Sequence, residues 1–228
     1  MTQLETELQQ LKDEARNMWG LVRSQLLKAL SSLLNFDRDL AREIVLMEKR
    51  VNASELKIDR DCENLFALYT PVAIDLRFLL AVLKINSNLE RIGDIAEGIA
   101  KYILSAEKSF TEELLETTQL IEMFRESIVM LDETLIAFET ENTTLARSVF
   151  EKDDFLDEIN INANARICEY LKEYPEDVDQ SLYALSIIRK LERVGDQAKN
   201  IAEEIIFYIE AKVLKHSDKK YAGEDNIH

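Results

Sequence analysis

Residues that break helices are scarce in this sequence. Its 228 residues include only five glycines and two prolines, whereas leucine, glutamate, alanine and lysine are abundant. Glycine and proline are the least favourable residues in a helix interior, and the abundant residues are among the best helix formers. The composition therefore predicts an all-α protein built from long helices, and it argues against a β-sheet.

Histidine and cysteine are equally scarce, which limits the chemistry available to the chain. The two histidines are His216, at the end of the last expected helix, and His228 at the C-terminus, so the Glu-x-x-His pairs of di-iron bundle enzymes are missing. Cys62 and Cys168 lack CxxC spacing and are interpreted as reduced thiols within helices. Neither a Gly-rich phosphate loop nor a GxSxG motif occurs. We therefore expect no catalytic residues and a protein that is not an enzyme.

Long apolar runs and an excess of positive charge are also missing. No stretch approaches the roughly 18 apolar residues that span a bilayer, and residues 1–20 lack the apolar region of a signal peptide. The formal net charge of −16 disfavours nucleic acid and anionic lipid, because both attract basic surfaces. We expect a cytoplasmic protein that neither inserts directly into membranes nor binds nucleic acid, and for which cations are the natural small partners.

Apolar residues recur at helical spacing in two similar halves. Each half predicts three long helices, and each of the two prolines ends one helix and starts the next. The six predicted helices span residues 3–34, 37–68, 72–105, 112–139, 142–174 and about 175–216. Helices of this length are about 45 Å long. The pattern thus predicts two tandem, elongated three-helix bundles, residues 1–107 and 108–216, followed by a disordered tail at 217–228.

A repeated motif lies in the third helix of each half. LERIGDIAEGIA at residues 89–100 returns as LERVGDQAKNIA at residues 191–202, with eight of twelve positions identical. Each copy carries two carboxylates four residues apart, which places them on one helix face, a turn apart. They are Glu90 with Asp94 and Glu192 with Asp196. Because these acids lie off the apolar stripe, helix packing does not explain their retention.

The second helix of each half carries polar residues at the same spacing. These are Glu48 with Asn52, and Asp153 with Asp157. If the helices are in register, each pair would face the motif of its own half, and the converging oxygens would suit Mg²⁺ or Mn²⁺, or carboxylate-bridged iron. A hydrated acidic surface without metal explains the same residues, and the register of neighbouring helices does not follow from sequence.

These stretches carry a resemblance to a known family. TPVAIDLRFLLAVLKINSNLERIGDIAEGIA in the first half and KLERVGDQAKNIAEEIIFYIEAKVLKH in the second resemble the PhoU family of phosphate-transport regulators, over essentially the whole chain before the tail. The resemblance implies two three-helix bundles in a cytoplasmic homodimer. It also implies negative regulation of phosphate uptake and of phosphate-starvation signalling, through an adaptor that acts between a phosphate ABC transporter and a sensor histidine kinase.

The resemblance further implies metal ions, commonly iron or zinc, bound through Glu/Asp-x-x-x-Asp motifs. The implied ligands are Glu48, Glu90, Asp94, Asp153, Asp157, Glu192 and Asp196. Because Asn52 replaces a carboxylate, we expect the first site to bind metal less tightly than the second. The acidic charge and the lack of anion-binding loops predict that the chain does not sense phosphate directly. A metal-dependent enzyme with a carboxylate-lined helical bundle is the alternative function.

Overall fold

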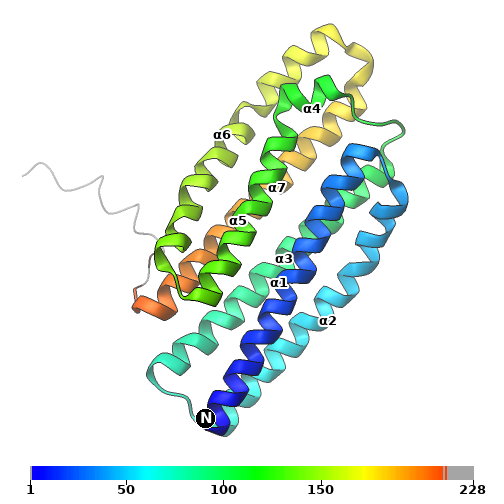
Figure 1. The fold of residues 1–228 in the computed structure, drawn as a ribbon. Coiled ribbons are helices and arrows are strands. Elements are labelled where there is room, and N and C mark those ends of the chain that lie inside the picture. Colours follow the sequence, from blue (N-terminus) through cyan, green and yellow to red (C-terminus); the bar gives the residue numbers. More distant parts are fainter. Residues whose placement is uncertain (1, 213, 215–228) are drawn as a thin grey trace, which may run out of the picture.

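The computed structural model describes residues 2–212 and 214, and that part of the chain consists of helices and their connections without a β-strand (Figure 1). The predicted all-α class is therefore confirmed. The helices are α1 (Gln3–Asn35), α2 (Arg38–Tyr69), α3 (Ala73–Ser105), α4 (Glu112–Thr118), α5 (Leu120–Thr140), α6 (Thr143–Glu173), the 3₁₀ turn η1 (Pro175–Asp177) and α7 (Val178–Glu210). None of these helices is long and apolar enough to cross a membrane.

Side chains that cap the helices fix several of these boundaries. Thr2 and Glu5 form a reciprocal capping box at the start of α1. Asp37, predicted as a cap from sequence, accepts hydrogen bonds from the backbone of Asp39 and Leu40 at the start of α2. The short α1–α2 connection makes these two helices antiparallel neighbours.

The structure differs from the prediction in the fourth helix, expected as one element over residues 112–139. Gln119 adopts a left-handed conformation with a φ of 57° and divides that stretch into α4 and α5. The hydroxyl of Thr118 donates to the Leu114 carbonyl at 2.7 Å, and the Gln119 amide nitrogen donates to the Glu116 carbonyl at 3.0 Å, which closes α4. Arg166 on α6 holds the Gln119 side chain. The apolar spacing continues across this break, so periodicity alone gave no sign of it.

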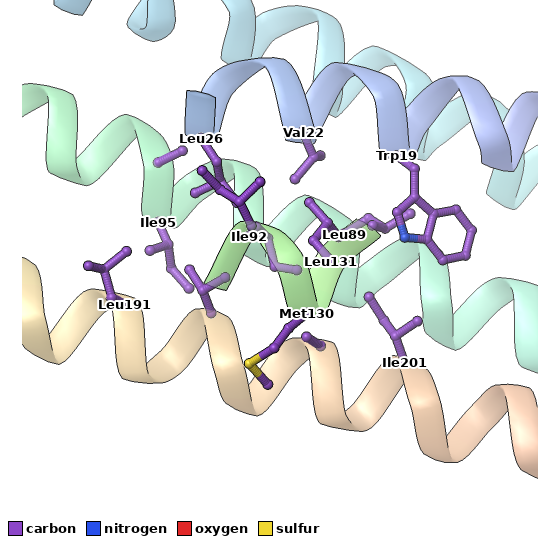
Figure 2. Close-up of a cluster of buried hydrophobic side chains, with 14 of the residues drawn as sticks. Trp19, Val22, Leu26, Leu89, Ile92, Ile95, Met130, Leu131, Leu191 and Ile201 are labelled. Atoms are coloured by element: carbon purple, nitrogen blue, oxygen red, sulfur yellow. The ribbon is translucent and has the colours of Figure 1, made fainter. Parts of the chain in front are cut away.

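The two bundles pack side by side along their length. Helices α1 and α5 contact each other, and α3 contacts α7, so α2 and α6 lie on the outside (Figure 1). The contacts between Lys84 and Glu204 and between Tyr102 and Tyr183 show that α3 and α7 are antiparallel. Figure 2 shows apolar side chains from α1, α3, α5 and α7 meeting in one cluster, so a single core runs through both bundles.

A fully buried tryptophan joins the two bundles. The indole nitrogen of Trp19 donates to the hydroxyl of Thr134 at 3.2 Å, and its ring lies 5.0 Å from that of Phe138. The last helix ends at Glu210, earlier than the expected end near residue 216. His216, His228 and the predicted tail at 217–228 lie outside the described residues. The proposed division at residue 107 remains a prediction.

Candidate metal centre

The first copy of the motif meets α2 across a cluster of carboxylates. Glu48 on α2 and Glu90 and Asp94 on α3 each present one oxygen, and these three atoms lie within 4.8 Å of one another. Helices α2 and α3 therefore place Glu48 opposite the motif, as the sequence hypothesis requires of this residue. Cations with oxygen ligands at about 2.0 to 2.6 Å could bridge such a span with little side-chain movement.

Glu48 is the buried member of this cluster, with 5% of its surface exposed. Gly93 makes room for it, because a β-carbon on Gly93 would lie 3.1 Å from Glu48 Oε2 and 3.0 Å from a methyl carbon of Val51. The Nε2 atom of buried Gln25 donates to Glu48 Oε2 at 2.9 Å. The other carboxylate oxygen, Glu48 Oε1, and the amide oxygen of Gln25 are both buried without a hydrogen-bond partner.

Burial raises the pKa of Glu48 to about 7, and the negative charges of Asp94 and Glu90 add to the effect. This buried carboxyl group loses its proton near neutral pH, and it lies beside an amide oxygen that accepts no hydrogen bond. Both groups therefore contain buried acceptor oxygens without a donor. These orphaned oxygens fit a cation, because a cation compensates the charge of several acidic groups and accepts their oxygens as ligands together.

Glu55 is a fourth member of this cluster, and the sequence interpretation missed it. Burial raises the pKa of Glu55, and so do the nearby carboxylates of Asp59 and Asp94. Glu90 in turn has a raised pKa, through burial first and then through Asp94 and Glu55. Glu55 lies seven residues after Glu48 in α2, a helical spacing that extends the pair recognised from sequence. Asn52, between them in sequence, is exposed.

The second copy of the motif gathers its own acids. Burial raises the pKa of Asp196, and the carboxylates of Asp153 and Asp157 raise it further. The pKa of Glu192 is raised by burial and then by Asp196, Asp157 and Asp153. The structure thus brings the four predicted ligands of the second half into one neighbourhood, across α6 and α7.

A lysine distinguishes the second cluster from the first. Lys199 occupies the position equivalent to Glu97, and its Nζ donates to Asp153 Oδ2 at 2.8 Å. Asp153 is 2% exposed, so this ion pair is buried on the carboxylate side and compensates its charge. Gly93 and Gly195 each face an acid and an apolar side chain, but the third neighbour is the polar Gln25 at Gly93 and the apolar Met130 at Gly195. The geometry therefore favours the first cluster for a cation, whereas the sequence interpretation favoured the second.

Comparisons with known proteins agree with the repeated architecture. A family model described as the PhoU domain matches residues 15–103 and 120–205, one match in each bundle. A phosphate-specific transport system accessory protein PhoU from Edwardsiella tarda is 32% identical over 214 residues, which is 94% of this chain and 87% of that protein. The protein of the same name from Escherichia coli is 31% identical, and the match covers 98% of this chain and 94% of that protein.

Solved structures share the fold at a similar level of identity. The crystal structure of PhoU from Pseudomonas aeruginosa is 30% identical and superposes with a TM-score of 0.85 over 92% of this chain and all of that one. The phosphate transport system regulatory protein PhoU from Streptococcus pneumoniae is also 30% identical, with a TM-score of 0.83 over 93% of this chain and 99% of that one. With both bundles matched in sequence and in structure, the chain belongs to the PhoU family.

Proposed function

We propose that this protein is a non-enzymatic negative regulator of phosphate uptake and of phosphate-starvation signalling. The observation that carries the proposal is the match of both bundles to the PhoU domain, together with relatives named as accessory proteins of the phosphate-specific transport system. In this role the protein is a cytoplasmic adaptor, and it contacts a phosphate ABC transporter and a sensor histidine kinase.

The surface of the molecule supports a role that depends on protein contacts. Large apolar side chains lie exposed where α2 ends and α3 begins, with Leu68, Val72 and Ile74 each more than half exposed. Such a group of exposed apolar side chains is typical of a protein interface. A homodimer and a docked transporter are both partners that could cover it, and membrane attachment through the transporter requires no inserted helix.

Deletion of the gene tests this function. In phosphate-rich medium, the deletion strain is expected to take up more phosphate and to express phosphate-starvation genes, and the intact gene should reverse both changes. Uptake of radioactive phosphate and a starvation-promoter reporter measure the two effects separately. Unchanged uptake and unchanged reporter activity in the deletion strain would contradict the proposal.

We also propose that a metal ion binds at Glu48, Glu90 and Asp94. The span of their oxygens and the unpartnered buried oxygens of Glu48 and Gln25 support it. Iron, zinc, manganese and magnesium are the ions considered, and the ion would supply positive charge that lets these carboxylates ionise together. Elemental analysis of protein purified without chelator identifies the ion, and a titration with each ion after chelation measures its affinity. Protein that neither retains an ion nor binds one would overturn this proposal.

A metal-dependent enzyme remains the second candidate function, because a group of three carboxylates can hold an ion that keeps open coordination positions. Relatives named as accessory proteins weigh against it. The test is a screen of the metal-loaded protein for hydrolysis of phosphate esters and for redox turnover. Activity that is abolished by Asp94→Asn would favour the enzyme, and its absence in metal-loaded protein would exclude these reactions.

A further inference from the structure

A groove with a volume of about 420 Å³ lies between α3 and α7, where the motif helices of the two bundles pack against each other. Its size falls within the range of small-molecule sites, about 300 to 1,000 Å³. Both copies of the motif contribute to its lining: Arg91 and Asp94 come from the first copy, and Arg193 from the second. The groove is therefore a joint feature of the two repeats, and it shares Asp94 with the carboxylate cluster between α2 and α3.

The lining of this groove is cationic in a chain that is strongly acidic. Arg91, Lys190 and Arg193 line it, and none of the three forms an ion pair within the described part of the chain. Lys101, a fourth lining cation, pairs with Glu97 at 2.5 Å. The lining contains four cations and two acids, Asp94 and Glu97, so the groove carries local positive charge although the chain has a net charge of −16.

Lys190 is held in place by its neighbours rather than by a carboxylate. It is partly buried, and its Nζ lies 5.6 Å from the centre of the Tyr102 ring. A β-carbon on Gly98 would lie 2.5 Å from this Nζ, so the absence of a side chain at position 98 creates the space that the ammonium group occupies. A partly buried ammonium group without an anionic partner is costly unless an anion compensates it.

A second lysine at the interface between α3 and α7 has a different partner. Lys84 lies over the ring of Phe207 at 5.4 Å, but its Nζ also bonds Glu204 at 3.0 Å. Glu204 is itself 3% exposed at its side chain, so Lys84 is matched by a buried carboxylate. Lys190 has the aromatic ring without such an ion pair, and the carboxylates of Asp94 and Glu97 act on it only from beyond ion-pair distance, which leaves its charge available to a ligand.

We propose that the groove between α3 and α7 binds a small phosphorylated anion through Arg91, Lys190 and Arg193. Arginine forks match the oxygens of a phosphate group in pairs, and a lysine adds a point charge. The groove exceeds the size of one phosphate ion, so a diphosphate or a nucleoside phosphate suits it, with Tyr102 available to contact a base. This site goes beyond the proposed function and does not depend on it, and binding at the site would run against the expectation that the chain does not sense phosphate directly.

The test is isothermal titration calorimetry of the full chain in EDTA, so that no metal mediates binding. The probes are inorganic phosphate, pyrophosphate and ATP, with citrate as an anion that lacks phosphorus. We expect binding of at least one phosphorylated probe, weakened by added salt. Pyrophosphate binding as tightly as ATP would place recognition in the phosphates alone, whereas tighter ATP binding would add a contact with the base. The proposal would be overturned if citrate bound as tightly as pyrophosphate and ATP, or if no phosphorylated probe bound at millimolar concentration.

Matched variants locate the binding site. Lys190→Gln and Arg193→Gln should each weaken binding at least about tenfold, because each removes a charge-assisted hydrogen bond. Arg189→Gln removes an exposed neighbouring charge that does not line the groove, and it should have little effect. Gly98→Leu keeps every charge but fills the groove, and it should also weaken binding. Equal affinity in all four variants would overturn the proposal, and circular dichroism on heating verifies that each variant is folded.

Discussion

A glycine within a helix lowers stability relative to alanine by about 0.5 to 1 kcal/mol, so its retention calls for a local reason. The long helices contain four glycines, and their surroundings differ. A β-carbon on Gly20 would have nothing within 4 Å, but one on Gly93 would meet Val51, Gln25 and Glu48 at about contact distance or closer. One on Gly195 would lie 2.8 Å from a methyl carbon of Leu156. Gly20 therefore has no steric reason, whereas Gly93, Gly195 and also Gly98, beside Lys190, each have one.

Alanine substitutions should separate these cases. Gly20→Ala is expected to raise the free energy of unfolding by about 0.5 to 1 kcal/mol, because it gains helix propensity without a clash. Gly93→Ala and Gly195→Ala should lose that gain and be at least about 1 kcal/mol less stable than Gly20→Ala, because overpacking costs about 1 to 3 kcal/mol. Urea denaturation of the three variants measures the order. A Gly93→Ala protein as stable as Gly20→Ala would show that the carboxylate of Glu48 moves away freely.

The buried carboxyl of Glu48 makes stability depend on pH. Its folded pKa of about 7 lies above the ordinary value of 4.5, because burial disfavours the ionised form. The unfolded chain therefore releases this proton at a lower pH than the folded chain does. The stabilising contribution is fully present below pH 4.5, falls as pH rises, and is lost above about pH 7. The full loss is on the order of 3 kcal/mol.

Glu48→Gln removes this titration but keeps an acceptor for Gln25. In EDTA, the stability of the original protein relative to Glu48→Gln is expected to fall by up to about 3 kcal/mol between pH 4.5 and pH 8. Chemical denaturation at a series of pH values measures this difference, and Glu63→Gln, at an exposed position of the same helix, controls for the loss of one charge. A relative stability that stays constant with pH would show that Glu48 ionises as an exposed group does.

Individual site residues differed in how far the sequence could reveal them. Glu90 and Asp94 were predictable, because the repeat conserves them at a spacing that defines one helix face. Gln25 was not, since its contact with Glu48 depends on how α1 packs against α2, and apolar periodicity does not fix that register. The bond of Lys199 to Asp153 depends on the same kind of contact between helices.

At the scale of the elements, the scarcity of glycine means that other residues end the helices. Left-handed positions that usually favour glycine are occupied here by Phe36, Thr70, Gln119, Glu141 and Ala211. The ends at Asp37 and the two prolines were predictable, because those residues have strong positional preferences. The break at Gln119 was not, because glutamine carries no such preference, and the left-handed turn is held by contacts within α4 and with α6.

Glycine at one of these positions should stabilise the fold. Glu141 follows the last residue of α5 with a φ of 53° and is exposed, and among the described residues its side chain makes only a long ion pair of 3.8 Å with Lys12. A left-handed backbone costs a residue with a β-carbon about 1 to 2 kcal/mol, and glycine avoids this cost. Part of the stability gained in this way is offset by the larger conformational entropy of glycine in the unfolded chain. Glu141→Gly should therefore raise the free energy of unfolding by about 0.5 to 1 kcal/mol. Glu141→Ala, which keeps the strain, is the control, and equal stability of both variants would contradict the argument.

At the scale of the whole molecule, the two bundles have similar helical arrangements but different sites. Both bundles place a carboxylate pair of the motif helix against acids of the preceding long helix, and α3 and α7 then pack the two motifs against each other. The carboxylate cluster of the first bundle leaves buried oxygens without hydrogen-bond partners, whereas the cluster of the second bundle contains its own cation, Lys199. A single core runs through both bundles, so the two sites belong to one packed unit.

This asymmetry predicts which half loses metal when a carboxylate is removed. Asp94→Asn should lower the amount of bound metal per chain to near zero, whereas Asp196→Asn should leave it unchanged, because Lys199 already compensates the second cluster. Lys199→Glu restores the acid found at Glu97 and frees Asp153, so it should add binding in the second half. Elemental analysis of the purified variants measures the metal per chain, and circular dichroism verifies the fold. If Asp196→Asn lost the metal and Asp94→Asn retained it, the second cluster would be the binding site.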